Sequence, residues 1–191
     1  MTQKLTDADL LARTEAVISA ATGVFLRYGY KRTTMADLAS AAQLSRPALY
    51  LLFPGKDEIF VAVIRRLNDQ MLANFRELLP KLQLLESRLQ RFCADWGAHG
   101  FELMEKHPDA ADLFNLSFPI VREMYEQFIK FLAELLAKTG GPSRLKVSPA
   151  ALARNLVYSL RGLRETARDR HHLREMIRLQ VEIVVAALQN A

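Results

Sequence analysis

Residues 33–56, TTMADLASAAQLSRPALYLLFPGK, decide the fold. Thr34 and Asp37 have the spacing of a capping box, which predicts a helix that begins just after Thr34. Ser45 can cap a second helix, and Pro47 falls in its first turn, where the N–H that proline lacks would have no intrahelical partner. Apolar and small residues recur between these points at spacings that let two short helices pack together. The stretch therefore predicts a helix-turn-helix.

The second of these helices turns its N-terminal residues outward, as a recognition helix does when it enters the major groove. Arg46 is the chief candidate for a contact with a base edge, preferably guanine. Leu51 can contact a thymine methyl group, whereas Thr34 and Tyr50 are expected to hold phosphates and fix the register. The outward face consists of Ser45, Arg46, Pro47, Tyr50 and Leu51.

A longer run, residues 25–60, FLRYGYKRTTMADLASAAQLSRPALYLLFPGKDEIF, resembles the tetracycline-repressor (TetR/AcrR) family of transcriptional regulators. The shared features are an aromatic-Gly-Tyr before the Thr pair, Leu-Tyr-x-x-Phe at the end of the recognition helix, and a lysine that opens the next helix. The resemblance implies that Lys56 contacts a backbone phosphate; a solvated lysine is the alternative. The residues expected to bind DNA are Thr33, Thr34, Gln43, Ser45, Arg46, Pro47, Tyr50, Leu51 and Lys56.

Two positions depart from the family pattern. Leu51 stands where a polar residue is often expected, and Gln43 stands where a turn glycine is usual. Gln43 must therefore accept the dihedral angles of the turn under strain, or the chain must form another turn.

Composition favours an ordinary globular protein. Half of the 191 residues are hydrophobic, no apolar run approaches the length of a bilayer span, and the N-terminus lacks the apolar core of a signal peptide. One cysteine suits a reducing compartment, so we expect the cytoplasm, and the family resemblance implies that the organism is a bacterium. Seven basic and four acidic residues up to residue 56 supply +3 of the net charge of +5, which favours a nucleic-acid partner for that segment.

The whole chain has the periodicity of helices and no strand-like alternation, which predicts an all-α fold. We expect a three-helix DNA-binding domain over residues 1–56, whose first helix ends at Gly29. A helical regulatory domain should follow over residues 57–191. Its expected helices span residues 59–79, 84–99, 101–105, 109–138, 148–168 and 172–189, with a kink at Pro119. The first of them joins the two domains without a flexible linker.

Aromatic residues concentrate between positions 92 and 128, which is typical of a pocket for a small apolar or aromatic effector. TetR-like proteins hold effectors among the corresponding helices, and a kink at Pro119 would add room. The alternative is that these side chains simply form the core. The candidate lining residues are Phe92, Trp96, Met104, Phe114, Phe118, Tyr125 and Phe128.

The last two helices carry apolar stripes that can pair across a twofold axis into a four-helix bundle. The stripes can equally pack inward, and both can hold. The candidate dimer residues are Leu156, Leu160, Leu163, Ile177, Val181, Val184 and Leu188.

The sequence therefore predicts a cytoplasmic homodimer that represses transcription from a palindromic double-stranded DNA operator and is released by a small apolar effector. We expect no enzymatic activity, cofactor, metal site or membrane partner, because no phosphate loop, nucleophile elbow or metal-binding histidine pattern is present. Two alternatives stay open. One is an all-α small-molecule-binding protein or helical enzyme without specific DNA binding; the other is a regulator controlled by a protein partner.

Overall fold

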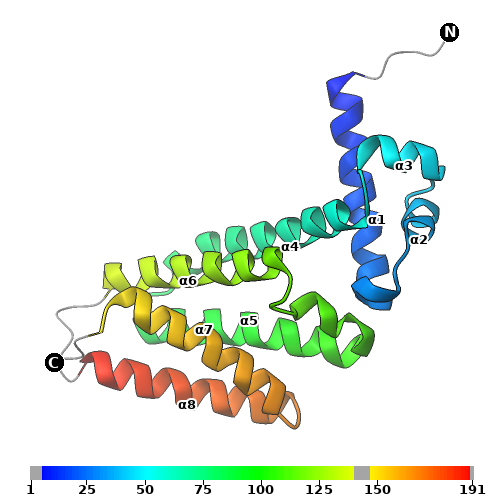
Figure 1. Cartoon of the computed structure of the whole chain (residues 1–191). Helices are drawn as coiled ribbons and strands as arrows, with labels where there is room; N and C mark the ends of the chain where they lie inside the picture. The colour runs from blue at the N-terminus through cyan, green and yellow to red at the C-terminus, as the bar shows by residue number, and fades with distance from the viewer. Residues whose placement is uncertain (1–5, 140–146, 190–191) are drawn as a thin grey trace. The chain divides into compact units, whose positions relative to one another are not determined.

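A computed structural model describes residues 6–139 and 147–189 of the chain, and over these ranges it contains helices and no β-strand. Figure 1 shows their arrangement. The prediction of an all-α fold is confirmed. The α-helices are α1 (Asp7–Arg32), α2 (Met35–Ala41), α3 (Arg46–Leu52), α4 (Lys56–Leu78), α5 (Leu85–Lys106), α6 (Pro119–Thr139), α7 (Pro149–Thr166) and α8 (Arg170–Gln189), with short 3-10 helices η1 (Leu79–Lys81) and η2 (Pro108–Phe114).

The chain divides into two compact units. The first, called the head here, comprises Met1–Asn68 and Lys106–Val121. The second, called the body, comprises Asp69–Glu105 and Arg122–Ala191. The expected functional boundary after residue 56 stays a prediction.

The head is built on α1, which buries one face formed by Val17, Ile18, Ala21, Val24 and Phe25. Its regular helix is interrupted at Gly29, where φ is 71° and ψ is 170°. A side chain at that position would be strained, so glycine suits it. The expected end of the helix at Gly29 corresponds to this break, although one more helical turn follows, to Arg32.

The helix-turn-helix forms as its capping residues predict. The Thr34 hydroxyl accepts the N–H of Asp37 at 3.3 Å, and the hydroxyl and backbone N–H of Thr34 hold the pKa of the Asp37 carboxyl below its usual value. The Ser45 hydroxyl accepts the N–H of Ala48 at 3.3 Å and so caps α3. Leu38, Ala39 and Leu49 are buried, which packs α2 and α3 together on one side of α1 (Figure 1).

Two expected helix boundaries were wrong. The break at Gly100 is absent, because α5 runs without interruption from Leu85 to Lys106. One glycine costs a helix only about 1 kcal/mol, which tertiary packing can offset. Pro119 does not kink a long helix either. It occupies the first position of α6, where the N–H that proline lacks costs no hydrogen bond, and a turn in which the Asn115 side chain accepts the Ser117 N–H at 2.8 Å precedes it.

The body buries apolar stripes from α5, α6, α7 and α8 in one core, and α7 and α8 run side by side (Figure 1). Its core residues include Phe75, Leu89, Phe92, Tyr125, Phe128, Leu132, Leu156, Leu160, Ile177 and Val181. Among the described helices of both units, none is long and apolar enough to cross a membrane.

The turn between α2 and α3 supplies a test of backbone strain. Gln43 has a φ of 56°, in the left-handed region, where a side chain costs about 1–2 kcal/mol. Gln43→Val should therefore lower the free energy of unfolding by about 1 kcal/mol or more, because β-branched residues tolerate this region least. Gln43→Gly should leave stability unchanged or raise it. Urea denaturation followed by circular dichroism measures both.

Gln70→Val is the matched control, because Gln70 lies exposed within α4, where the same exchange costs only a few tenths of a kcal/mol, roughly. Equal losses from Gln43→Val and Gln70→Val would show that the turn is not strained.

Candidate DNA-binding and effector-binding sites

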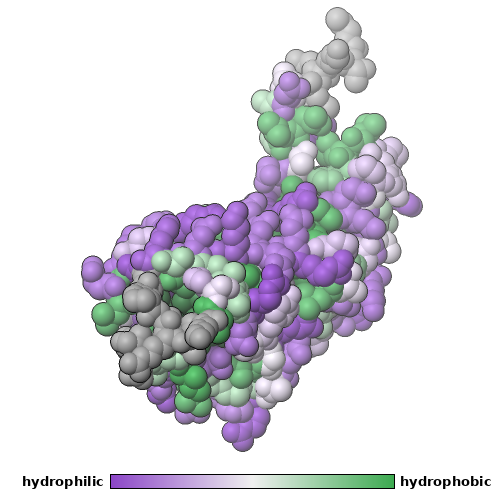
Figure 2. Space-filling view, turned by 60° about the vertical axis from the view of Figure 1, so that its left-hand side comes forward, coloured by the Kyte–Doolittle hydropathy of each residue, from purple (hydrophilic) through white to green (hydrophobic). Residues whose placement is uncertain are grey.

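The outward face of α3 is open to solvent, as the sequence predicts. Leu51 is 86% exposed and Tyr50 is 46% exposed, and Arg46 and Pro47 are exposed as well. The start of α1 adds two exposed leucines, Leu10 and Leu11. In Figure 2, hydrophobic side chains interrupt the hydrophilic surface near the grey N-terminal residues. Contiguous apolar patches on a surface are typical of places where a partner binds, whereas single exposed apolar side chains are common.

Thr33 corrects the predicted DNA-binding set. Its side chain is only 2% exposed, and its hydroxyl donates to the Gly29 carbonyl at 2.6 Å. The residue therefore closes the break in α1 and presents no side chain to a phosphate. Thr34 is exposed, but its hydroxyl also donates to the Asp37 carboxylate at 2.7 Å.

Lys56 makes contacts inside the head that the sequence did not indicate. Its ammonium nitrogen donates to the carbonyl of Tyr30 at 2.9 Å and to that of Thr33 at 3.0 Å, and it lies 4.2 Å from the centroid of the Tyr30 ring. The alternative of a merely solvated lysine is wrong. These carbonyls and the ring face explain why a cation stands in the first turn of α4, where the helix dipole disfavours it.

Aromatic side chains pack together around Tyr30, next to Lys56. The Tyr30 ring lies 4.8 Å from those of Phe60 and Phe118, and the Tyr30 hydroxyl donates to the Asp57 carboxylate at the start of α4. Tyr30 therefore folds back onto the start of α4 and anchors it to the end of α1. The recognition helix is thus held by a framework that joins the end of α1 to the first turn of α4.

Residues 106–121, the connection between α5 and α6, belong to the head. The 3-10 helix η2 packs on α1, and Arg32 forms an ion pair with Asp109. Phe118 packs against the rings of both Tyr30 and Phe60. Both partners of the ion pair are more than half exposed, so the pair contributes little. The apolar contact of Phe118 therefore contributes more than the ion pair to the free energy with which residues 106–121 pack on the head.

This placement divides the predicted effector pocket. Phe118 is a packing residue of the head, and Phe114 lies in η2 of the same unit. Phe92, Trp96, Tyr125 and Phe128 lie in the body and form a buried cluster with centroid separations of 5.4 to 6.2 Å. The rings contact one another, so the alternative that they form core holds for this cluster. Met104 is half-buried on α5.

Two of the grooves on the described surface of the body are lined by none of the seven predicted pocket residues. The larger, of about 540 Å³, lies between α4 and α5 and includes Met71, Phe75, Asp95 and His99. The second, of about 380 Å³, includes Phe131 and Leu135. Cys93 is no reactive group beside them, because burial raises the pKa of its thiol to about 12.

The body core instead contains a charged side chain that the sequence analysis missed. Arg164 on α7 is 5% exposed, and its guanidinium donates to the Tyr125 hydroxyl at 3.4 Å. A signal was present in the sequence: Arg164 continues the buried positions Leu156 and Leu160 at the four-residue step of a helix. An arginine at a position of an otherwise apolar helix stripe indicates a buried charge.

The predicted dimer residues mostly face the protomer's own core. Leu156, Leu160, Ile177 and Val181 are at most 1% exposed and Val184 is 5% exposed, so only Leu163 and Leu188 reach the surface, both half-buried. The periodicity was right, but the inward face was taken for the outward one. The outward face of α8 presents Leu179 and Ile183, which are 55% and 57% exposed. Gly162 is exposed on α7, with open space around it.

We compared the chain with known protein families and solved structures. Residues 17–63 match the model of the bacterial regulatory proteins of the tetR family. A TetR-family transcriptional regulator from Pectobacterium atrosepticum has the same fold, with a TM-score of 0.69 at 19% identity, over 96% of this chain and 97% of that one. Residues 17–63 therefore form a DNA-binding domain of the TetR family.

Two curated relatives are similar over a longer part of the chain. The HTH-type transcriptional regulator RutR of Escherichia coli is 28% identical over 106 residues, which cover 54% of this chain and 46% of RutR. The HTH-type transcriptional repressor Rv1474c of Mycobacterium tuberculosis is 33% identical over 105 residues, which cover 54% of this chain and 55% of the repressor. The chain thus spans about half the length of the curated relatives it matches. Both are named as regulators of transcription, which agrees with the expectation that this chain is not an enzyme.

Lys56 supplies a test of the framework that holds the TetR-type reading head. Lys56→Met removes two hydrogen bonds from a charged donor and should lower the free energy of unfolding by about 1–2 kcal/mol. Lys81→Met is the control: it removes an exposed ion pair with Glu77, worth less than about 0.5 kcal/mol. Chemical denaturation followed by circular dichroism measures both, and equal stability of the two variants would contradict a structural role for Lys56.

Proposed function

We propose that this protein is a homodimeric transcriptional regulator, a repressor that binds a palindromic operator and leaves it when a small molecule binds the body. The capped helix-turn-helix with the exposed face of α3 supports this most directly. The excess of positive charge in the first 56 residues, which phosphates attract, supports it further. The similarity to the repressor Rv1474c, over about half of its length, supports repression as the effect on transcription.

Within the head we assign separate roles to separate side chains. Arg46 stands in the first turn of α3 and can reach O6 and N7 of a guanine with its two-pronged guanidinium. Leu51, almost fully exposed, offers an apolar contact to a thymine methyl. Tyr50, Thr34, Ser45 and Pro47 border the same surface and fit phosphate or sugar contacts. Lys56 acts on DNA chiefly by fixing the position of the helices, because its ammonium binds two carbonyls.

Gln43 belongs to the same surface and keeps its predicted place in it. It is exposed at the turn before α3, in the left-handed conformation that the usual glycine would adopt without strain. We therefore propose that this DNA-binding domain uses an amide side chain at the turn to contact the DNA backbone, where the family pattern usually has a glycine.

The path of the chain supports a coupling between effector binding to the body and operator binding by the head. Helix α4 passes from the head into the body after residue 68, and residues 106–121 return from the body to pack on α1. An effector that favours one arrangement of the body therefore acts on the head through two covalent connections. The expected coupling free energy is about 1–3 kcal/mol, enough to change operator affinity by about one to two orders of magnitude.

The homodimer follows from the operator. Two recognition helices must be roughly 34–36 Å apart, or a multiple of that, to read the two halves of a palindrome. The exposed apolar residues of α8, Leu179 and Ile183, with Gly162 on α7 for close approach, replace the buried residues that the sequence had favoured. Leu163 and Leu188, half-buried, border this surface.

A second candidate is a regulator controlled by a protein partner instead of a small molecule. The close packing of Phe92, Trp96 and Phe128 in the body favours it, because rings in mutual contact leave little volume for an apolar ligand between them. Operator affinity that no small molecule changes would support this candidate.

A substitution of Arg46 tests whether α3 recognises the DNA sequence. Arg46→Ala should cost about 1–3 kcal/mol of discrimination at one base pair of each half-site and should relax the preference at that position. Fluorescence anisotropy with the DNA upstream of the coding region, across single-base variants and a salt series, measures it. Arg91→Ala, which removes an exposed arginine of the body paired with Asp95, should bind as the wild type does. A wild-type protein that binds all DNA alike would contradict the proposed function.

The dimer surface is tested by charge insertion. Ile183→Glu should give a folded monomer with weak operator binding, because a carboxylate buried in an apolar interface costs several kcal/mol, roughly. Leu84→Glu is the control, since Leu84 is 65% exposed outside the surface formed by α7 and α8. Sedimentation equilibrium measures the mass of each variant. A dimeric Ile183→Glu protein would show that another face of the chain forms the interface.

A further inference from the structure

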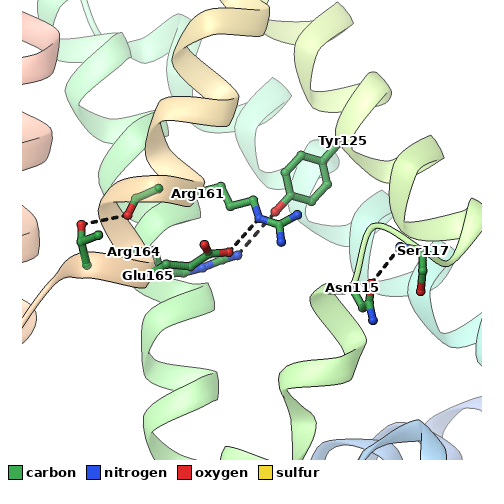
Figure 3. A network of polar contacts seen from close by, with 8 residues as sticks. Asn115, Ser117, Tyr125, Arg161, Arg164 and Glu165 are labelled. Carbon is green, nitrogen blue, oxygen red and sulfur yellow. Dashed lines mark hydrogen bonds and ion pairs between the residues drawn. The ribbon is translucent and has the colours of Figure 1, made fainter.

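The interior of the body is filled where its helices meet. The Tyr125 hydroxyl on α6 accepts from Nη2 of Arg164 on α7 at 3.4 Å, and Figure 3 shows the two side chains directed toward each other. Gly100 on α5 lies so close to the same guanidinium that an added Cβ would overlap it. Close packing of this kind leaves little volume for a ligand, so a small molecule that binds the body is expected in a groove on its surface.

One groove on that surface has a volume of about 380 Å³. Sites for small molecules have volumes of roughly 300–1,000 Å³, so the groove is large enough for one. It is called the basic groove here, after Arg76, Arg88 and Lys138 in its lining. Its walls are the end of α4 with η1, the start of α5 and the end of α6, which all belong to the body.

Apolar side chains form one part of this lining. Two of them are buried and two are half-buried: Phe75, Leu79, Phe131 and Leu135. The Phe131 ring is stacked on the rings of Phe75 and Phe92, with centroid separations of 6.1 and 5.9 Å. Since these contacts hold the ring in place, the basic groove offers a preformed surface to an apolar group.

The charged part of the lining has an excess of positive charge. It contains three cationic side chains and one carboxylate, that of Glu134, which gives a formal charge of +2. Over the ranges that the structure describes, neither Arg76 nor Lys138 forms an ion pair with a carboxylate; the Arg76 guanidinium lies 6.0 Å from the centroid of the Phe131 ring. Positive charges around an apolar surface favour a ligand that is both anionic and apolar.

Arg88 is the residue best prepared to bind an anion. It is half-buried, and its Nε donates to the Leu82 carbonyl at 2.8 Å, which fixes the position of the guanidinium. Its terminal nitrogens have no protein partner among the described residues. A carboxylate or phosphate can accept two parallel N–H groups from such a guanidinium, and a side chain that is already ordered loses less entropy on binding.

The larger groove, of about 540 Å³, has no comparable charge preference. Its carboxylates, Glu77, Asp95 and Glu102, each form an ion pair with a lysine or an arginine. The charges in its lining are therefore compensated within the protein, whereas those of the basic groove are not.

We propose that the basic groove binds an organic anion, a carboxylate or phosphate attached to a short apolar group, and that such an anion is the effector. Arg88 would bind the anionic group, Arg76 and Lys138 would attract it, and the apolar group would contact Phe131. The role as effector rests on the proposed function. The proposal replaces the purely apolar effector that the aromatic residues alone had indicated.

Titration calorimetry with the 191-residue chain tests this inference. The probes are octanoate for a carboxylate and octyl phosphate for a phosphate. Octan-1-ol is the neutral counterpart and octylammonium the cationic one, each with the same apolar chain. At least one anion should bind about tenfold or more tightly than octan-1-ol, as the loss of a charged hydrogen bond predicts, and octylammonium should bind no better than octan-1-ol.

Substitutions locate the site. Arg88→Met keeps a long side chain without charge and should weaken binding of the anion by about tenfold or more, while octan-1-ol binds as before. Lys138→Met removes an exposed charge and should weaken it by about two- to fivefold. Lys130→Met is the matched control, because Lys130 is an exposed lysine of the same helix that does not line the basic groove. It should bind the anion as the wild type does.

If Arg88→Met fails to fold, the double variant with Arg76→Met and Lys138→Met replaces it, since both side chains are exposed. This double variant should bind the anion about tenfold less tightly than the wild type, because the two exposed charges act together.

Three outcomes would overturn the proposal. They are a wild type that binds neither anion, equal affinity for the anions and octan-1-ol, and variants of the basic groove that bind the anion no more weakly than Lys130→Met does. Because calorimetry is done without DNA, these outcomes do not depend on operator binding. A protein that binds octanoate in the basic groove but fails in the anisotropy measurements would contradict the proposed function and leave the anion site standing.

Discussion

The head depends on the contact between Lys56 and the two carbonyls of Tyr30 and Thr33. These carbonyls lie just after the break at Gly29, where the helix can no longer satisfy them internally. Lys56 supplies the missing donors from the first turn of α4, and the Tyr30 hydroxyl returns a hydrogen bond to Asp57 in that same turn. The end of α1, the start of α2 and the start of α4 are therefore fixed at one point.

Fixing this point gives the short helices their stability. Helices α2 and α3 have seven residues each, too few to persist alone in water. They gain stability from burying Leu38 and Leu49 and from the side-chain caps at both N-termini. The recognition face is then presented by a rigid support, which lowers the conformational entropy lost on binding DNA.

The body, in contrast, buries a charged side chain in an apolar core. Most of its interior is the close-packed aliphatic and aromatic side chains expected of a helical unit. Arg164 interrupts that pattern, and Gly100 leaves the space for it, so two residues on different helices are matched to one feature. A buried charge of this kind lowers stability unless its partners offset the cost of removing it from water.

The sequence by itself determined the local features of this protein. Thr34, Asp37, Ser45 and Pro47 define the helix-turn-helix, because caps and first-turn prolines act within three or four residues. Gln43 could be recognised as strained for the same local reason. Helical periodicity likewise gave the all-α class and most helices, although it misplaced the boundaries at Gly100 and Pro119.

Only the tertiary structure decided which faces are inside and which distant residues meet. Periodicity marks an apolar stripe but not the direction it faces, so Leu156 and Val181 were assigned to a dimer surface that Leu179 and Ile183 fit better. Lys56 reaches carbonyls 23 and 26 residues earlier, and Arg164 meets a hydroxyl 39 residues away. Such pairs depend on how whole helices pack, and no spacing along the chain records them.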